Sequence, residues 1–258
     1  MGSEESAAGE SAVEIRSGVF RPDWSAVTRS AARRALNGRM TARAGLLGRW
    51  SHRLDADEDR VWRTILKLYA DRGHPPQLRD IAAETGIAAD RLPTMLHKLQ
   101  SHDLIGFHPS SGHIQIAYPF TEAATGHRVE LKEHTLWALC AIDALGVAGM
   151  FGADITVSSP CPQCGKVVYA KTRAEGRALH SVAPSGAVVW YDFAYDGSAA
   201  ISCCPAIQFF CSDEHLQQWL SARTPRRNGI SLTVDEALEV GRAIFGPVLV
   251  ERFPDIQN

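Results

Sequence analysis

The first 139 residues of this 258-residue chain contain no cysteine, and all six cysteines lie in the remainder. Cysteines that serve only as small packing residues would not avoid half of a chain so consistently. The clustering therefore favours thiolate chemistry or metal binding in one C-terminal region. The N-terminus also lacks the charged and apolar segments of a secretory signal. We therefore expect a cytoplasmic protein with reduced thiols rather than a disulfide framework.

Long uncharged apolar runs are absent as well, and neither sign of charge dominates the chain. The longest apolar run, over residues 136–152, carries Asp143 at its middle, whereas a membrane-spanning helix needs about 20 mostly uncharged residues. The formal net charge of -2 gives no overall reason to bind a polyanion. The sequence thus predicts no membrane partner, and any contact with nucleic acid must be local.

Two segments are predicted to precede the main domains. Residues 1–20 are rich in Ser, Glu and Gly and predict a flexible tail. Residues 21–55 predict an Arg-rich helical extension with a single acid, Asp23, before residue 54. Its arginines could contact phosphates or an acidic partner. Alternatively, they form the solvated face of helices that pack on the rest of the protein. They are Arg21, Arg29, Arg33, Arg34, Arg39, Arg43, Arg49 and Arg53.

Residues 56–122 predict a winged helix-turn-helix-like domain. Apolar residues at helical spacing indicate helices over residues 57–72, 77–85 and 89–102, and Gly73 and Gly86 end the first two. Two strands with a turn at residues 110–112 complete the pattern. This fold can bind DNA or serve only for packing or dimerisation. DNA is the weaker expectation, because the third helix offers few donors: Arg91, His97, Lys98 and His102.

Residues 123–258 predict a mixed α+β core. Helices are expected over residues 134–150, 213–222 and 234–252, with Ser212 or Asp213 and then Thr233 as the caps of the last two. Strands are expected over residues 155–158, 166–170, 188–195 and 201–210. The fold class is therefore α+β, with an N-terminal helical domain.

Two groups of residues in this core can carry chemistry. Cys140 and Asp143 lie three positions apart in the predicted helix, so they share a face at a Cβ separation of about 5–6 Å. An acid in such an apolar run is rarely buried without a partner or a task, and burial would raise its pKa. The second group is the adjacent pair Cys203 and Cys204. On an extended strand only one of these thiols can face Cys140, and the spacing does not say which.

Four motifs together resemble the organomercurial (alkylmercury) lyase family. They are Leu-Cys-Ala-Ile-Asp at residues 139–143, Val-Ser-Ser-Pro-Cys at residues 157–161, Cys-Cys at residues 203–204 ahead of Phe-Phe at residues 209–210, and Val-Asp-Glu-Ala at residues 234–237. The resemblance covers roughly residues 131–252. It implies a lyase-type α+β core with a mostly antiparallel sheet, behind an N-terminal helix-turn-helix-like domain.

The resemblance also implies an activity and roles for individual residues. Cys140 and Cys203 would be the mercury-binding thiols, with Cys204 as a further candidate ligand, Asp143 the proton shuttle and Cys161 a structural cysteine. The enzyme would cleave a carbon–mercury bond to give a hydrocarbon and Hg(II), without a cofactor, in mercury detoxification. Soft Hg(II) prefers thiolates, and an aspartate can take a thiol proton and deliver it to carbon. Hg(II) would then pass to a thiol acceptor such as mercuric reductase.

The chain departs from the family pattern in two ways. Leu139 stands before Cys140 where the lyases carry a tryptophan, and the nearest one is Trp137. Cys161-Pro-Gln-Cys164-Gly forms a knuckle typical of zinc sites, and Cys211 and His215 add two donors at ligand-like spacing, which predicts a structural zinc. Buried small cysteines and a surface histidine are the alternative. A zinc-containing metal-sensing or DNA-binding regulator, or a relative that binds another metal or organometal, remain as alternative functions.

Overall fold

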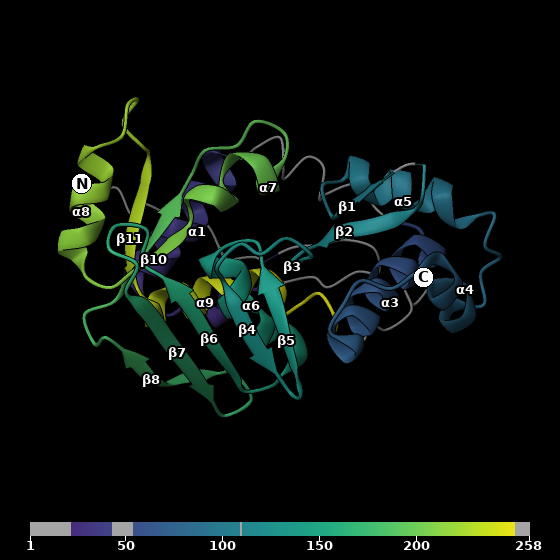
Figure 1. Cartoon of the computed structure of the whole chain (residues 1–258), viewed down its shortest axis with the longest axis horizontal. Coiled ribbons are helices and arrows are strands. Elements are labelled where there is room, and N and C mark those ends of the chain that lie inside the picture. Colours follow the sequence, from purple (N-terminus) through teal and green to yellow (C-terminus); the bar gives the residue numbers. More distant parts are fainter. Residues whose placement is uncertain (1–21, 43–53, 109, 251–258) are drawn as a thin grey trace, which may run out of the picture.

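The computed structural model describes residues 22–42, 54–108 and 110–250 (Figure 1). The predicted tail over residues 1–20 lies outside the described residues. The helices, with 3-10 turns marked η, are η1 (Trp24–Ala26), α1 (Ser30–Ala42), α3 (Ala56–Arg72), α4 (Leu78–Thr85), α5 (Leu92–Ser101), α6 (Ala141–Phe151), α7 (Ala199–Ser202), η2 (Cys204–Ala206), α8 (Asp213–Ser221) and α9 (Val234–Phe245). The strands are β1 (Ile105–His108), β2 (His113–Ala117), β3 (Phe120–Thr121), β4 (Arg128–Leu131), β5 (His134–Ala138), β6 (Ile155–Pro160), β7 (Val167–Arg173), β8 (Ala178–Ala183), β9 (Val188–Asp192), β10 (Gln208–Phe210) and β11 (Gly229–Thr233).

The N-terminal helical unit consists of α3, α4, α5 and the β1–β2 hairpin, at the right of Figure 1. α3 begins at a capping box, in which the Asp55 side chain accepts from the Glu58 N–H and the Glu58 side chain accepts from the Asp55 N–H. It ends at Gly73, whose φ of 75° lies in the left-handed region that favours glycine. The predicted three helices and two strands of this unit are confirmed.

Two antiparallel sheets form the rest of the fold. Within the described residues, eight strands pair in the order β1-β2-β3-β5-β4-β6-β7-β8, and three pair in the order β10-β9-β11. Because β3 pairs with both β2 and β5, the hairpin of the helical unit continues into the sheet of the core. The predicted α+β fold with a mostly antiparallel sheet is confirmed. The boundary between residues 122 and 123 stays a prediction.

Helices α6 and α9 pack closely against each other in the core. α6 is apolar on nearly all sides and buried, which fits a helix enclosed by other elements. A Cβ atom added at Gly146 would collide with the ring of Phe245 on α9. The glycine therefore permits a contact that fixes α6 and, with it, the Asp143 side chain in its first turn.

Two segments near the candidate cysteines differ from the prediction. The predicted helix over residues 134–150 is wrong in its first part, because residues 134–138 form β5 and pair with β4. Leu136 and Ala138 are buried while Thr135 is exposed, so the apolar run contained a strand alternation before the helix. The predicted strand over residues 201–210 is also wrong up to Ile207. Pro205 lies in the 3-10 turn η2, and only Gln208–Phe210 is extended.

The described part of the Arg-rich extension packs on the core. α1 contacts α9 and β11, and Glu239 of α9 accepts hydrogen bonds from the Thr28 and Arg29 N–H groups at 2.9 Å each. Arg29 also forms an ion pair with Glu239 at 2.7 Å. The predicted phosphate contacts at Arg21, Arg43, Arg49 and Arg53 lie outside the described residues.

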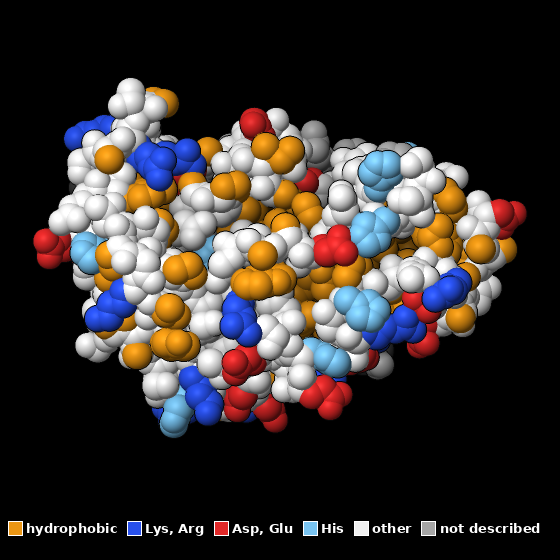
Figure 2. All heavy atoms as spheres, viewed as in Figure 1, with side chains coloured by type: hydrophobic (Ala, Val, Ile, Leu, Met, Phe, Trp, Pro, Cys, Tyr) orange, Lys and Arg blue, Asp and Glu red, His pale blue; other side chains and the backbone are white. Residues whose placement is uncertain are grey.

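The surface in Figure 2 carries positive and negative side chains interspersed rather than one continuous basic face. None of the helices in the described parts of the chain is both long and apolar enough to cross a bilayer.

Candidate active site

Cys140 lies at the N-terminus of α6 and caps it. Its backbone is extended (φ −153°, ψ 176°), and its Sγ accepts a hydrogen bond from the Asp143 N–H at 3.4 Å. The Ala141 N–H donates to the Ile207 carbonyl at 3.0 Å, which ties this end of α6 to the segment after Cys204. Cys140 and Asp143 are close, as their spacing predicted, but through a helix cap and not through a shared helix face.

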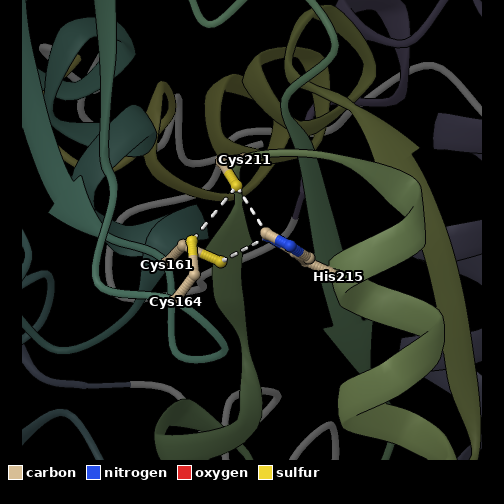
Figure 3. Close-up of side chains that lie close together, drawn as sticks. All are labelled: Cys161, Cys164, Cys211 and His215. Carbon is tan, nitrogen blue, oxygen red and sulfur yellow. Dashed lines mark hydrogen bonds between the residues drawn. The ribbon is translucent and has the colours of Figure 1, made fainter.

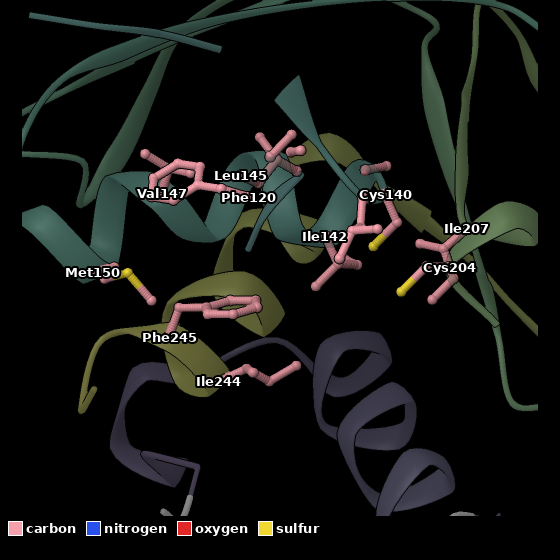
Figure 4. Packing of buried hydrophobic residues seen from close by; sticks show 14 of the residues in the cluster. Phe120, Cys140, Ile142, Leu145, Val147, Met150, Cys204, Ile207, Ile244 and Phe245 are labelled. Atoms are coloured by element: carbon pink, nitrogen blue, oxygen red, sulfur yellow. The ribbon is translucent and has the colours of Figure 1, made fainter. Parts of the chain in front are cut away.

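Cys204 completes a buried cluster with these two residues. Its Sγ donates to Asp143 Oδ2 at 3.6 Å, and one ligand atom from each of Cys140, Asp143 and Cys204 lies within 4.8 Å of the others. All three side chains are buried. Figure 4 shows the side chains of Cys140 and Cys204 with their sulfurs close together. Two thiols and a carboxyl group therefore converge on one point.

Cys203 has a different orientation from Cys204. It ends the short helix α7, and its Sγ donates to the Ala199 carbonyl at 3.6 Å. Its side chain lines the same cavity but is not part of the three-residue cluster. The helical turn, rather than strand alternation, thus decides which thiol of the pair faces Cys140.

A hydrogen-bond network from the helical unit holds α7 in position. The buried carboxylate of Asp103 accepts from the Ala199 N–H at 2.9 Å and from the Tyr195 hydroxyl at 3.2 Å through Oδ2. Its Oδ1 accepts from the Tyr118 hydroxyl at 3.2 Å, and that hydroxyl accepts from the Ala200 N–H at 2.8 Å. Asp103 therefore caps the helix that leads into Cys203 and Cys204.

The cluster opens into a cavity of about 30 Å³, enough for about two water molecules. Arg39 of α1 lines it and donates to the Tyr191 hydroxyl at 3.0 Å. Burial lowers the pKa of this guanidinium, but the charges of Tyr191, Cys203 and Asp143 outweigh burial and raise the pKa overall. Arg39 therefore supplies fixed positive charge beside the cluster. The other lining residues are Trp62, Asp103, Leu104, Tyr118, Ile142, Ala199, Cys203, Ile207, Ile244, Phe245 and Val248.

Both thiols of the cluster resist ionisation. Burial raises the pKa of Cys140 to about 11, and the negative charge of Asp143 adds to this effect. A hydrogen bond from Cys204 lowers the pKa but does not outweigh them. The pKa of Cys204 is raised well above its ordinary value, first by its hydrogen bonds to Cys140 and Cys203 and then by burial. Near neutral pH both groups are therefore thiols that still carry their protons.

The chain is similar to one known protein family over about half of its length. Residues 120–246 match the model of the alkylmercury lyase family. An alkylmercury lyase of Staphylococcus epidermidis is 32% identical over 183 residues, which span 70% of this chain and 80% of the relative. This chain belongs to the alkylmercury lyase family. An alkylmercury lyase of Bacillus cereus is 27% identical over 199 residues, or 76% of this chain and 86% of that protein.

A solved structure has a similar fold over most of this chain. The crystal structure of the mercury-bound form of MerB2 superimposes with a TM-score of 0.65, covering 85% of this chain and 100% of the other, at 21% sequence identity. The helical unit and the core are thus parts of one known architecture.

The predicted zinc ligands form a second cluster (Figure 3), and none of them lines the cavity. One ligand atom from each of Cys161, Cys164, Cys211 and His215 lies within 4.8 Å of the others. Burial raises the pKa of Cys161, yet N–H groups of Cys211, Gln163 and Cys164 that donate to its sulfur lower the pKa overall to about 7. The structure brings all four predicted ligands together.

The predicted DNA donors on α5 are largely engaged within the protein. Arg91 forms an ion pair with Asp57 at 3.1 Å, and Lys98 forms one with Glu58 at 2.7 Å. The His97 ring contacts Phe107 edge-on. These contacts give the regulator alternative little support.

Sequence reasoning did not identify Arg39, Asp103 and Tyr118 as site residues. Arg39 carried a usable signal, because it continues the buried helical stripe of Ala32, Ala35 and Leu36 and therefore faces inward. Asp103 and Tyr118 reach the site only through contacts between distant segments, which no local pattern reveals.

Proposed function

We propose that this chain is an alkylmercury lyase that cleaves carbon–mercury bonds by protonolysis and releases a hydrocarbon and Hg(II). The observation that carries the proposal is the buried cluster of Cys140, Asp143 and Cys204 at a cavity. Mercury is a soft ion for which thiolates are the preferred ligands. A carboxyl group within reach of both sulfurs can accept and deliver protons. A protein that only binds a metal ion would not need such a group.

In the first step, mercury of R–Hg⁺ bonds to one sulfur and displaces its proton, although the pKa of the free thiol is high. A metal ion deprotonates a coordinating thiol outright because it replaces the proton. Asp143 Oδ2, which lies 3.6 Å from Cys204 Sγ, accepts the proton. The three side chains of the cluster are buried, so little bulk water competes for the proton before it reaches the substrate carbon.

In the second step, the other sulfur joins the mercury and releases its proton to solvent, and the proton on Asp143 passes to carbon as the carbon–mercury bond breaks. The bonding pair of that bond becomes the new C–H bond. The overall reaction is R–Hg⁺ plus two thiols giving R–H, Hg(II) held by two thiolates, and one proton. Atoms and charge balance without any redox cofactor, and Asp143 ends as a carboxylate.

We assign the two mercury ligands to Cys140 and Cys204, and not to Cys203 as the family resemblance implied. The Sγ of Cys204 donates to the Asp143 carboxylate, whereas the Sγ of Cys203 donates to the Ala199 carbonyl. Cys203 is close enough to accept mercury in a later step, since its side chain also lines the cavity.

Release of the product needs an external thiol, because two thiolates hold Hg(II) too tightly for water to displace them. We propose that a low-molecular-weight dithiol or a cysteine pair of a partner such as mercuric reductase takes the ion by exchange. A reducing compartment such as the cytoplasm supplies such thiols and keeps the cluster reduced.

The proposal is tested by incubating the protein with phenylmercury acetate and excess cysteine and measuring benzene in the headspace. Benzene that rises with enzyme concentration, and is absent with the Cys140→Ser variant, supports it. A folded wild-type protein that retains phenylmercury without releasing benzene would overturn it and leave a mercury-binding protein as the function.

A further inference from the structure

The second cysteine cluster lies between the two sheets, whose strands do not pair with each other within the described residues. Cys161 and Cys164 lie in the turn between β6 and β7 of the eight-stranded sheet. Cys211 follows β10 of the three-stranded sheet, and His215 lies in the first turn of α8. Figure 3 shows the four side chains directed at a common centre.

The turn has the backbone of a metal-binding knuckle. The Cys161 N–H donates to the Lys166 carbonyl at 2.9 Å, and the Gly165 N–H donates back to the Cys161 carbonyl at 2.8 Å. Gly165 has a φ of 75°, in the left-handed region that favours glycine. The N–H groups of Gln163 and Cys164 donate to the Cys161 sulfur. Donation from several N–H groups favours a thiolate at this position.

The distances between the donor atoms fit a tetrahedral ion. With Zn–S near 2.3 Å and Zn–N near 2.05 Å, a tetrahedron needs sulfur–sulfur distances of about 3.8 Å and sulfur–nitrogen distances of about 3.5 Å. The distance between Cys164 Sγ and Cys211 Sγ is 3.5 Å. His215 Nδ1 lies 2.9 Å from Cys211 Sγ and 4.0 Å from Cys161 Sγ. Changes of about 0.3–0.6 Å in these three distances would bring them to the values of a tetrahedral zinc site.

We propose that Cys161, Cys164, Cys211 and His215 bind one structural zinc ion that locks the β6–β7 turn to the start of α8. Three thiolates and one imidazole fill the four positions of tetrahedral zinc and leave none open for a substrate, which is the mark of a structural site.

The zinc ion also has a consequence for the catalytic segment. Cys211 directly follows β10, which is preceded by η2 with Cys204. One end of this segment is tied to the helical unit through Asp103. The zinc ion fixes the other end against the eight-stranded sheet, so its loss loosens the segment that carries Cys204.

The test is metal analysis of the full chain, purified under reducing conditions without chelator from zinc-supplemented cells. We expect about one zinc per chain in the wild type. Cys164→Ser and Cys211→Ser should lower this content sharply and reduce the melting temperature. The matched control is Cys140→Ser, which should keep its zinc if the ion is held at the knuckle. Folded wild-type protein without zinc that fails to bind added Zn²⁺, or zinc lost from Cys140→Ser and kept in Cys164→Ser, would overturn the proposal.

A second measurement applies if the variants fail to fold. Replacement of zinc by Co²⁺ in the wild type should give the intense visible bands of a tetrahedral ion and sulfur-to-cobalt charge transfer in the near ultraviolet. An octahedral spectrum without charge transfer, or a Cys164–Cys211 disulfide detected by mass spectrometry in protein purified under reducing conditions, would contradict a zinc site. Binding of Hg(II) but not of zinc or cobalt would do the same.

Discussion

The Sγ atom of Cys204 lies 3.6 Å from Oδ2 of Asp143, and both side chains are buried. This contact joins the first turn of α6 to the 3-10 turn η2, which are more than fifty residues apart in the sequence. It gives the carboxyl group direct access to a thiol proton. In the proposed mechanism, the proton transfer uses this contact and the mercury is held with the help of the neighbouring sulfur of Cys140.

The first prediction separates the two adjacent cysteines. Cys204→Ser should reduce benzene release from phenylmercury to the level of Cys140→Ser, because each variant removes one mercury ligand from the cluster. Cys203→Ser should retain most of the rate, since its thiol is directed at the Ala199 carbonyl. Single-turnover rates of the three variants provide the test. A Cys203→Ser variant as inactive as Cys204→Ser would show that both thiols are needed.

The second prediction concerns the protonation of Cys140. Burial raises the pKa of this thiol to about 11, so its thiolate fraction below that pH should rise about tenfold per pH unit. The rate of its modification by a small alkylating agent, followed by peptide mass spectrometry, should therefore rise steadily from pH 7 to pH 9. A rate that is already constant above pH 7 would mean that the resting group is a thiolate.

The third prediction concerns Asp103 as a positioning residue for α7. Asp103→Asn removes the charge from three hydrogen bonds, to the Ala199 N–H and to two tyrosine hydroxyls. Charge-assisted bonds of this kind contribute about 1.5–3 kcal/mol each. We expect faster amide exchange over residues 199–206 and slower benzene release, with phenylmercury capture by Cys140 retained. Unchanged exchange in this segment, with a general loss of stability instead, would argue against positioning.

The fourth prediction is a loss of stability in acid that depends on His127. Burial lowers the pKa of this imidazole to about 4 and outweighs a hydrogen bond that the ring donates to the Gln208 side chain, which raises the pKa. In the unfolded chain His127 takes up a proton below about pH 6.5, whereas in the folded chain it does so only below about pH 4. The free energy of unfolding therefore falls as the pH falls through this window. Between pH 7 and pH 5 the loss should be about 2 kcal/mol.

Urea unfolding at pH 7 and pH 5 measures this effect. In His127→Gln the free energy of unfolding should fall less between the two pH values than in the wild type, whatever the stability of the variant at pH 7. Equal falls in both proteins would show that His127 is not the group responsible.

Local patterns predicted much of the fold because many elements carry their own signals. Helices α3 and α4 end at Gly73 and Gly86, and Thr233 caps α9 as predicted. Local patterns failed where pairing with another strand decided the structure. Residues 134–138 join β4 as a strand even though the run up to residue 150 is apolar enough for one long helix.

The site was predictable in part for the same reason. Two residues three positions apart lie close together both on a helix face and at a helix cap. The proximity of Cys140 and Asp143 was therefore predictable without knowing where the helix begins. The choice between Cys203 and Cys204 did depend on it, because a strand and a 3-10 turn direct adjacent side chains differently. Asp103 contacts α7 across more than ninety residues, beyond the reach of any local pattern.

The central claim is that Asp143 delivers the proton that breaks the carbon–mercury bond, and a single-turnover comparison of the wild type with Asp143→Asn tests it most directly. Asparagine keeps the size of the side chain, so both proteins should capture phenylmercury, measured as the mass of the adduct, and circular dichroism should show the same fold. Benzene release should then be about 10²–10⁴-fold slower in the variant, the usual contribution of a general acid–base group. A folded Asp143→Asn protein that releases benzene at the wild-type rate would contradict the claim.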